Sequence, residues 1–257
     1  MWDSRPIIAR IAGGVQFTVQ SNFVFPSSNT HSNQSQTMQR TADNSQELTS
    51  QQLGILDALV PLVAQRMQGQ QAGHGLDHVQ RVVMSARAIQ SEVGGCPFIV
   101  ELAAWLHDIG DAKFHEGHER SGEFSREILQ QFNLLDETIE HVVSIVDGIS
   151  FRKSSSSSTL TLEGQIVQDA DRLDALGAIG IVRTIEYGAT RNQPFFDPAS
   201  DLLSDPTGVG HFYQKLFKLR KLLNTEPARR ISQQREEFMR EFLRQFFSEC
   251  GVAVEVP

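Results

Sequence analysis

Imidazole and carboxylate side chains interrupt segments of this chain that are otherwise apolar. His74 and His78 stand four positions apart in GHGLDHVQRV, His107 and Asp108 end the run ELAAWLHD, and IVQDADRLDALGAIGIVR contains Asp169, Asp171 and Asp174. Burying such groups in a helical core is costly unless they are paired or bind a metal ion. Imidazole and carboxylate together are typical ligands of Mn²⁺, Fe²⁺, Co²⁺ or Ni²⁺. The residue types therefore indicate a metal site, and catalysis there needs one open coordination position.

The segments that must position these side chains have the periodicity of helices. From Leu53 onward, apolar residues recur three and four positions apart, and Thr49 and Ser50 are candidate N-caps for the first helix. The expected helices cover about residues 53–63, 74–92, 98–109, 120–132, 136–146, 162–185, 208–223 and 228–247. No run of alternating apolar residues predicts a strand. We therefore expect an all-α domain in which several helices bring the candidate ligands together in a bundle core.

The N-terminal part of the chain differs in composition from the rest. Residues 27–52 are dominated by Ser, Thr, Asn and Gln, a composition that cannot bury enough apolar surface to offset the entropy of ordering. We expect residues 1–50 to be a disordered, dispensable extension and residues 51–250 to form the functional domain. An organellar transit peptide in residues 1–26 is the alternative that we consider weaker.

Composition excludes several classes of function. The 257 residues carry a net charge of −8, which argues against binding of extended nucleic acid but allows a small anionic substrate at a local basic or metal site. No stretch approaches the roughly 18 apolar residues that a membrane span needs. Cys96 and Cys250 have no CxxC spacing, and this usage is typical of a reducing compartment. We expect a cytoplasmic protein.

The order of the candidate ligands resembles a known signature. His78, the pair His107–Asp108 and Asp171 follow the H…HD…D pattern of the HD superfamily of metal-dependent phosphohydrolases. The blocks GHGLDHVQRV, AAWLHDIGDAKF, QDADRLDALGAIGIVR and HFYQKLFKLRKLLNTEPARRI are similar to the bacterial YedJ/YpgQ-type branch of that superfamily. The resemblance covers roughly residues 53–247. It implies an HD-domain helical bundle in which these four residues are the metal ligands.

Other polar residues near the signature leave alternatives open. Asp169 and Asp174 flank Asp171 in the same expected helix and are alternative ligands. Some HD branches hold a second metal ion with additional histidines, which would make the centre dinuclear. We expect one ion, because the spacing of three further histidines does not match a dinuclear pattern. These histidines are His115, His118 and His141.

The residues around the signature also suggest catalytic and substrate-binding roles. Asp111 lies four positions after His107, so a helix continuing that far would direct both side chains to one site, where Asp111 can accept a proton from water. We expect Lys113 to contact phosphate and to be catalytic with Asp111, whereas Arg81 and Arg172 join helices through carboxylates. The expected substrate-binding residues are His74, Lys113, Lys153, Arg183, Lys215 and Lys218.

The resemblance implies a metal-dependent hydrolysis of a phosphate ester or anhydride. Similar proteins suggest a nucleotide substrate, such as a nucleoside triphosphate cleaved to monophosphate and pyrophosphate, or a related phosphate ester. We expect one divalent ion per chain, Mn²⁺ first, with Co²⁺, Ni²⁺, Fe²⁺ or Mg²⁺ as alternatives. The competing hypotheses are a non-catalytic regulator that binds a nucleotide or metal, and an oxidative di-iron enzyme of the HD fold. The sequence makes no prediction of the oligomeric state.

Overall fold

The computed structural model describes residues 8–10, 16–18, 47–69, 75–112, 115–149, 160–199, 201 and 206–253. The chain divides into two compact units, Met1–Asp43 and Asn44–Pro257. In the first unit, strands β1 (Ile8–Arg10) and β2 (Gln16–Thr18) pair antiparallel, with Ala9 opposite Phe17. The sequence has no alternating apolar pattern that predicts these strands. The remaining residues of the expected disordered extension, up to residue 46, lie outside the described residues.

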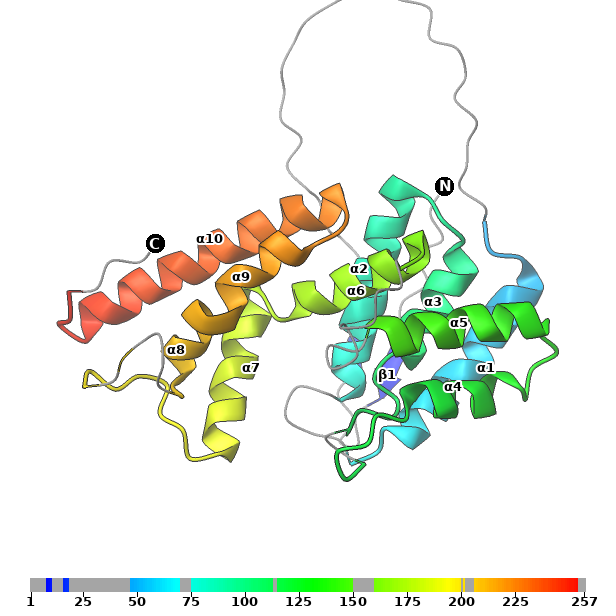
Figure 1. Ribbon diagram of the computed structural model, residues 1–257, viewed down its shortest axis with the longest axis horizontal. Helices are drawn as coiled ribbons and strands as arrows, with labels where there is room; N and C mark the ends of the chain where they lie inside the picture. Colours follow the sequence, from blue (N-terminus) through cyan, green and yellow to red (C-terminus); the bar gives the residue numbers. More distant parts are fainter. Residues whose placement is uncertain are drawn as a thin grey trace, which may run out of the picture. The chain divides into compact units, whose positions relative to one another are not determined.

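The second unit is helical, which confirms the predicted all-α class (Figure 1). None of the described helices is both long enough and apolar enough to cross a membrane. A π-helical segment, Phe212–Leu216, joins α8 to α9, and a 3₁₀ turn, Arg220–Leu222, follows α9. The helices are α1 (Ser50–Arg66), α2 (Leu76–Val93), α3 (Pro97–Leu106), α4 (Ser121–Leu129), α5 (Asp136–Ile149), α6 (Leu162–Asp174), α7 (Gly177–Thr190), α8 (Gly208–His211), α9 (Phe217–Leu219) and α10 (Glu226–Glu249).

Local sequence explains where the first and last helices begin. Thr49 is the N-cap of α1, as expected: its Oγ1 accepts the N–H of Gln52 at 3.2 Å. The side chain of Gln52 in turn accepts the N–H of Thr49 at 2.9 Å. This reciprocal pair satisfies two N–H groups that a helix start otherwise leaves without partners. At α10, Thr225 is the N-cap and Pro227 occupies the first turn, where a missing N–H costs nothing.

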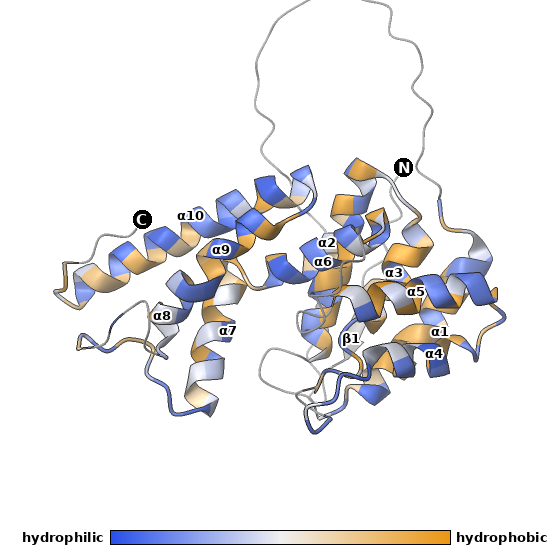
Figure 2. Ribbon diagram, viewed as in Figure 1, coloured by the Kyte–Doolittle hydropathy of each residue, from blue (hydrophilic) through white to orange (hydrophobic). Residues whose placement is uncertain are grey.

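Helix α3 forms the centre of the bundle. Every residue from Phe98 to Leu106 is buried, and all of them are apolar except Glu101, which accepts hydrogen bonds from Arg87. It packs against α1, α2, α5 and α6, and α2 packs against α6 as well. By contrast, α10 is amphipathic, with hydrophilic and hydrophobic residues alternating around it in Figure 2. The contacts among α2, α3 and α6 bring the three segments that carry the candidate ligands together.

One predicted helix is two helices in the structure. The expected helix over residues 162–185 is divided into α6 and α7 by a break at Ala175 and Leu176. Gly177 has φ of 75°, a conformation that other residues rarely adopt. A side chain on Gly180 would clash with the carbonyl oxygen of Ala175. The two glycines thus permit a tight corner, and α7 packs against α10 beyond it.

Replacing the corner glycine should destabilise the fold. Gly177→Ala forces a side chain into the left-handed region, at a cost of about 1–2 kcal/mol, and its Cβ would lie 3.1 Å from Cγ of Arg235. The matched control is Gly54→Ala in α1, where nothing lies within 4 Å of the new Cβ. That change should stabilise the protein by up to about 1 kcal/mol. Urea denaturation measures both. Equal free energies of unfolding for the two variants would contradict the conformational role of Gly177.

Candidate metal centre

Four side chains meet where the beginning of α2, the end of α3 and the last turns of α6 come together. The Nε2 atoms of His78 and His107 lie 3.2 Å apart. Nε2 of His78 is 3.4 Å from Oδ2 of Asp108 and 3.4 Å from Oδ1 of Asp171. Nε2 of His107 is 3.7 Å and 3.9 Å from the same two oxygens. The structure therefore brings all four expected ligand residues together, and His78, His107 and Asp171 form a possible metal site.

The hydrogen bonds of the two imidazoles direct an electron pair of each ring into this cluster. His107 donates from Nδ1 to the carbonyl oxygen of Ala104 at 2.9 Å. His78 donates from Nδ1 to Oδ2 of Asp174 at 2.7 Å. In a neutral ring, Nε2 then has only a lone pair to offer. The lone pairs of these two nitrogens and the negative charges of the two carboxylates repel one another unless a cation lies between them.

The spacing of these atoms is compatible with such a cation. Nitrogen and oxygen atoms bound to one ion at about 2.1 Å are roughly 3.0–3.4 Å apart in ordinary coordination geometries. The distances within the cluster run from 3.2 to 3.9 Å. Imidazole and carboxylate groups, with no thiolate among them, suit Mn²⁺, Fe²⁺, Co²⁺ or Ni²⁺. The residues present thus fit a divalent metal ion in both type and spacing.

The charges of the cluster perturb its titration. Burial lowers the pKa of His78, but the carboxylates of Asp108 and Asp171 outweigh burial and raise that pKa well above its ordinary value. Burial raises the pKa of Asp171, and His78 and His107 outweigh it, so the pKa of Asp171 is lowered. Without an ion the cluster therefore attracts a proton. A metal ion competes with that proton for Nε2 of His78, and metal binding should release it.

Asp174 orients His78 and is itself held by two arginines. Arg81 donates to both of its oxygens, from Nε to Oδ1 at 2.7 Å and from Nη2 to Oδ2 at 3.0 Å. Arg183 donates from Nη1 to Oδ2 at 2.6 Å. Burial raises the pKa of Asp174, but the hydrogen bonds from His78 and Arg81 outweigh it and hold that pKa well below its usual value. A fixed carboxylate behind a histidine ligand sets its tautomer and increases its basicity.

Asp169, the other flanking acid, stabilises a helix end away from the cluster. Its carboxylate accepts the N–H groups of Asn224 and Thr225, the latter at 2.7 Å. It also accepts from the side chains of both residues, at 2.9 and 2.8 Å. These bonds fix the turn that leads into α10. The three aspartates of QDADRLD thus have separate surroundings, and Asp171 is the one that faces both imidazoles.

The remaining expected site residues are not among the four that form the cluster. α3 ends at Leu106, and the N–H of Asp111 donates to the carbonyl oxygen of Asp108 at 3.2 Å in the turn that follows. Asp111 is half-buried, four residues after His107. The chain forms a turn here and not the continuing helix that the spacing predicted. Lys215 and Lys218 are exposed in the π-helical segment and α9. His74, Lys113 and Lys153 lie outside the described residues.

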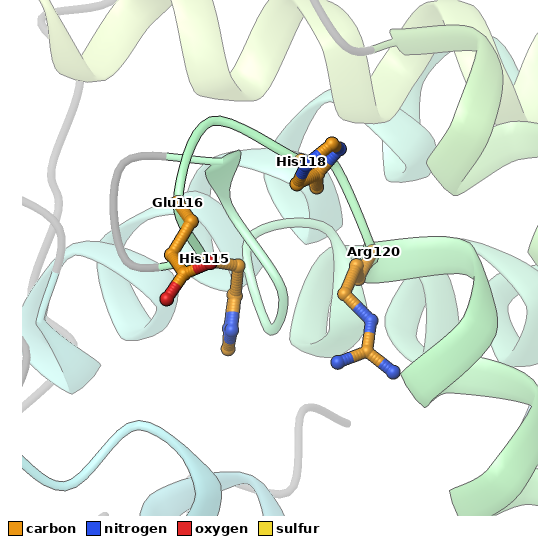
Figure 3. A pocket seen from close by; sticks show the side chains of 4 residues that line it. All are labelled: His115, Glu116, His118 and Arg120. Atoms are coloured by element: carbon orange, nitrogen blue, oxygen red, sulfur yellow. The ribbon is translucent and has the colours of Figure 1, made fainter.

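The loop after the cluster returns to the end of α3 and forms an open pocket. The carbonyl oxygen of Gly110 accepts the N–H of Arg120 at 3.0 Å, and a side chain on Gly110 would collide with the Arg120 backbone. The pocket is lined by His115, Glu116, His118 and Arg120 (Figure 3). Among the residues that the structure describes, the group that can hold an ion includes neither of these histidines.

The sequence predicted the four side chains that meet here but not the residues that support them. Asp174 lies three positions after Asp171, which places both on neighbouring turns of one helix face, so its contact with the site was detectable. Arg81 joins α2 to α6 through Asp174, as expected. Arg183 reaches the same carboxylate only because the chain turns at Gly177, and no spacing rule indicates that.

The two flanking aspartates should respond differently to substitution. Asp174→Asn removes the charge behind His78, and loss of such an orienting partner typically weakens metal affinity by about 10–100-fold. Asp169→Asn is the matched control, because it weakens the start of α10 but touches no ligand. It should lower the free energy of unfolding and leave metal affinity unchanged. Calorimetric titration with Mn²⁺ and urea denaturation separate the two effects. Unaltered metal affinity in Asp174→Asn would contradict its orienting role.

Comparison with protein families agrees with this geometry. Residues 75–176 match the model of the HD domain, a segment that contains all four residues of the cluster. The chain is 34% identical over 176 residues to the Bacillus subtilis protein YpgQ, an alignment that spans 68% of this chain and 83% of YpgQ.

Solved structures show the same fold. An HD-superfamily hydrolase from Bacillus thuringiensis is 32% identical, with a TM-score of 0.67 over 79% of this chain and 100% of that protein. YpgQ of Bacillus subtilis in complex with ADP is 30% identical, with a TM-score of 0.67 over 77% of this chain and 96% of that one. A protein from Lactobacillus plantarum is 34% identical, with a TM-score of 0.65 over 80% and 99% of the two chains.

Proposed function

The chain belongs to the HD-domain family, in its YpgQ-type branch, and on that basis we propose that it is a divalent-metal-dependent phosphohydrolase. One observation supports the proposal most strongly: the Nε2 atoms of His78 and His107 face each other at 3.2 Å beside two carboxylates. His78, His107, Asp108 and Asp171 would hold the ion. The charges of the two carboxylates would neutralise a divalent cation.

When bound, the ion supplies positive charge beside a phosphoryl group and makes water acidic enough to react near neutral pH. The residues of the chain have the remaining tasks. Asp174, fixed by Arg81 and Arg183, keeps the imidazole of His78 at a constant orientation. The same arginines add positive charge at the edge of the cluster. The side chain of Arg183 is 19% exposed.

Asp111 is the proposed general base. Its backbone is tied to that of Asp108 in one turn, so its carboxylate belongs to the segment that borders the cluster. In the hydrolysis, the oxygen of a water attacks phosphorus, its proton passes to Asp111, and the bond from phosphorus to the leaving oxygen breaks. Lys113, two positions further on, would stabilise charge on the phosphate.

The proposed substrate is a nucleotide, either a nucleoside triphosphate cleaved to monophosphate and pyrophosphate or a related phosphate ester. The structure of the relative YpgQ in complex with ADP supports this class. Mn²⁺ is the ion that we propose, because two imidazoles and two carboxylates suit it, and Co²⁺, Ni²⁺, Fe²⁺ and Mg²⁺ are the alternatives to compare. A cytoplasmic location and a single ion per chain are parts of the same proposal.

The function is tested with a panel of nucleotides and phosphate esters in the presence of each of these ions. Turnover should require a divalent ion and disappear with a chelator. Asp108→Ala removes a ligand and a charge, so it should abolish metal retention and turnover together. Glu137→Ala, an exposed acid in α5, is the control and should behave as the wild type. Full activity and metal content in Asp108→Ala would refute the assignment.

The same experiment separates the competing functions. A regulator would bind metal and nucleotide without turnover. A di-iron oxidative enzyme would retain two metal ions per chain. Metal analysis of the purified protein alongside the activity panel distinguishes both from the proposed phosphohydrolase.

Asp111→Asn separates the base from the ligands. The amide keeps the size of the side chain but cannot accept the proton, and loss of a general base typically lowers kcat by about 10²–10⁴-fold. Metal affinity and folding stability should be preserved. Turnover is measured at saturating metal, and metal binding by calorimetry. Unchanged turnover would make Asp111 a surface acid, whereas lost metal binding would make it a ligand.

A further inference from the structure

One side of α7 faces the metal centre. Arg183 projects from the middle of α7 to Asp174, and its Nη1 is also 3.2 Å from Nδ1 of His78. Residues four positions apart on a helix lie on the same side. The side of α7 that carries Arg183 is therefore directed toward the cluster, while Ile181 and Thr184 are buried on the side that faces the rest of the bundle.

Large side chains are exposed on this side of α7, one turn before and one turn after Arg183. Ile179 is 38% exposed and Tyr187 is 43% exposed. Tyr187 lies four positions after Arg183, so both side chains leave α7 on the same side, one turn apart. An exposed aromatic residue one turn from an arginine that contacts Asp174 is a feature that the proposed hydrolysis does not use.

The ring of Tyr187 is also held in place. The guanidinium carbon of Arg191, one further turn along, lies 4.3 Å from the centroid of the Tyr187 ring. Guanidinium groups stack on aromatic rings through cation–π attraction, which restricts both side chains. Tyr187 and Arg191 thus form a prearranged flat surface at the end of α7.

We propose that Tyr187, supported by Arg191, is the nucleobase subsite of the active centre. This inference rests on the proposed function and specifies how the substrate is oriented. The phosphates lie at the cluster and the base stacks on the Tyr187 ring. Arg183 marks the boundary between the two parts.

The dimensions and charges along α7 support this orientation. Four residues of a helix span about 6 Å, so Tyr187 is displaced from Arg183 by a distance comparable to the span from phosphate to base in a nucleotide. Glu186 beside Tyr187 is exposed and negative, so it offsets the positive charge of Arg191 at this end of α7. An aromatic face, by contrast, accepts any base because every base has a π-surface.

The test compares nucleotides with a substrate that has no base. Tyr187→Ala should raise KM for nucleoside triphosphates by about 10-fold or more, as expected for the loss of one base–aromatic stack. Its KM for inorganic tripolyphosphate should not change, nor should its Mn²⁺ affinity. Tyr187→Phe keeps the ring and should restore nucleotide binding. Ile185→Ala is the matched control, since Ile185 is 44% exposed on α7 but lies two positions from Arg183 and so on another side.

Each outcome decides the inference. If Tyr187→Ala alters KM for tripolyphosphate as much as KM for nucleotides, or leaves both unchanged, the base subsite is refuted while the phosphohydrolase function stands. If Ile185→Ala has the same effect as Tyr187→Ala, the effect is general to the helix and the subsite is refuted. A wild-type protein that neither binds nor hydrolyses any nucleotide, although it hydrolyses other phosphate esters, refutes the subsite and the nucleotide substrate together.

Discussion

The hydrogen bond from His78 to Asp174 is the interaction on which the rest of the site depends. It joins the first turn of α2 to the last turn of α6, and it fixes which nitrogen of the imidazole faces the other ligands. A buried carboxylate is costly by itself, and Arg81 and Arg183 offset this cost with short, charge-assisted hydrogen bonds. The same bonds therefore stabilise the packing of α2 on α6 and orient an imidazole of the candidate metal site. A chain that failed to form this contact would lose both at once.

The corner between α6 and α7 extends this arrangement to a third helix. Had residues 162–190 formed one straight helix, Arg183 would lie about 13 Å beyond Asp174 along the axis, out of reach of the carboxylate. The break at Ala175, with the positive φ of Gly177, turns α7 so that Arg183 returns to Asp174. The corner is therefore required both for the charged hydrogen bond between Arg183 and Asp174 and for the packing of α7 on α10. It also determines which side of α7 can contact a substrate.

Three aspartates within six residues have different roles because each faces a different neighbour. Asp169 faces the start of α10 and accepts hydrogen bonds from Asn224 and Thr225, the two residues that precede this helix. Asp171 faces the two imidazoles, and Asp174 faces one imidazole from behind together with two arginines. The helix repeat separates these directions. Asp169 and Asp171, two positions apart, point to different sides of α6, whereas Asp171 and Asp174, three positions apart, point to neighbouring sides. The identity of each neighbour then determines whether the carboxylate stabilises a helix start, belongs to the candidate metal site or orients an imidazole.

The sequence by itself determined the helical class, most helix positions and the four residues that meet at the centre. Apolar periodicity predicts the helices because it reports which side of each helix is buried, and the resemblance to the HD signature singles out the four residues among the polar groups of those helices. The capping pair at Thr49 and Gln52 was likewise readable, since it depends on residues three positions apart. Only the tertiary structure decided the end of α3 at Leu106, the corner at Gly177 and the support of Asp174 by Arg183. These features depend on contacts between residues distant in sequence or on the conformation of single glycines, and neither has a periodic signal along the chain.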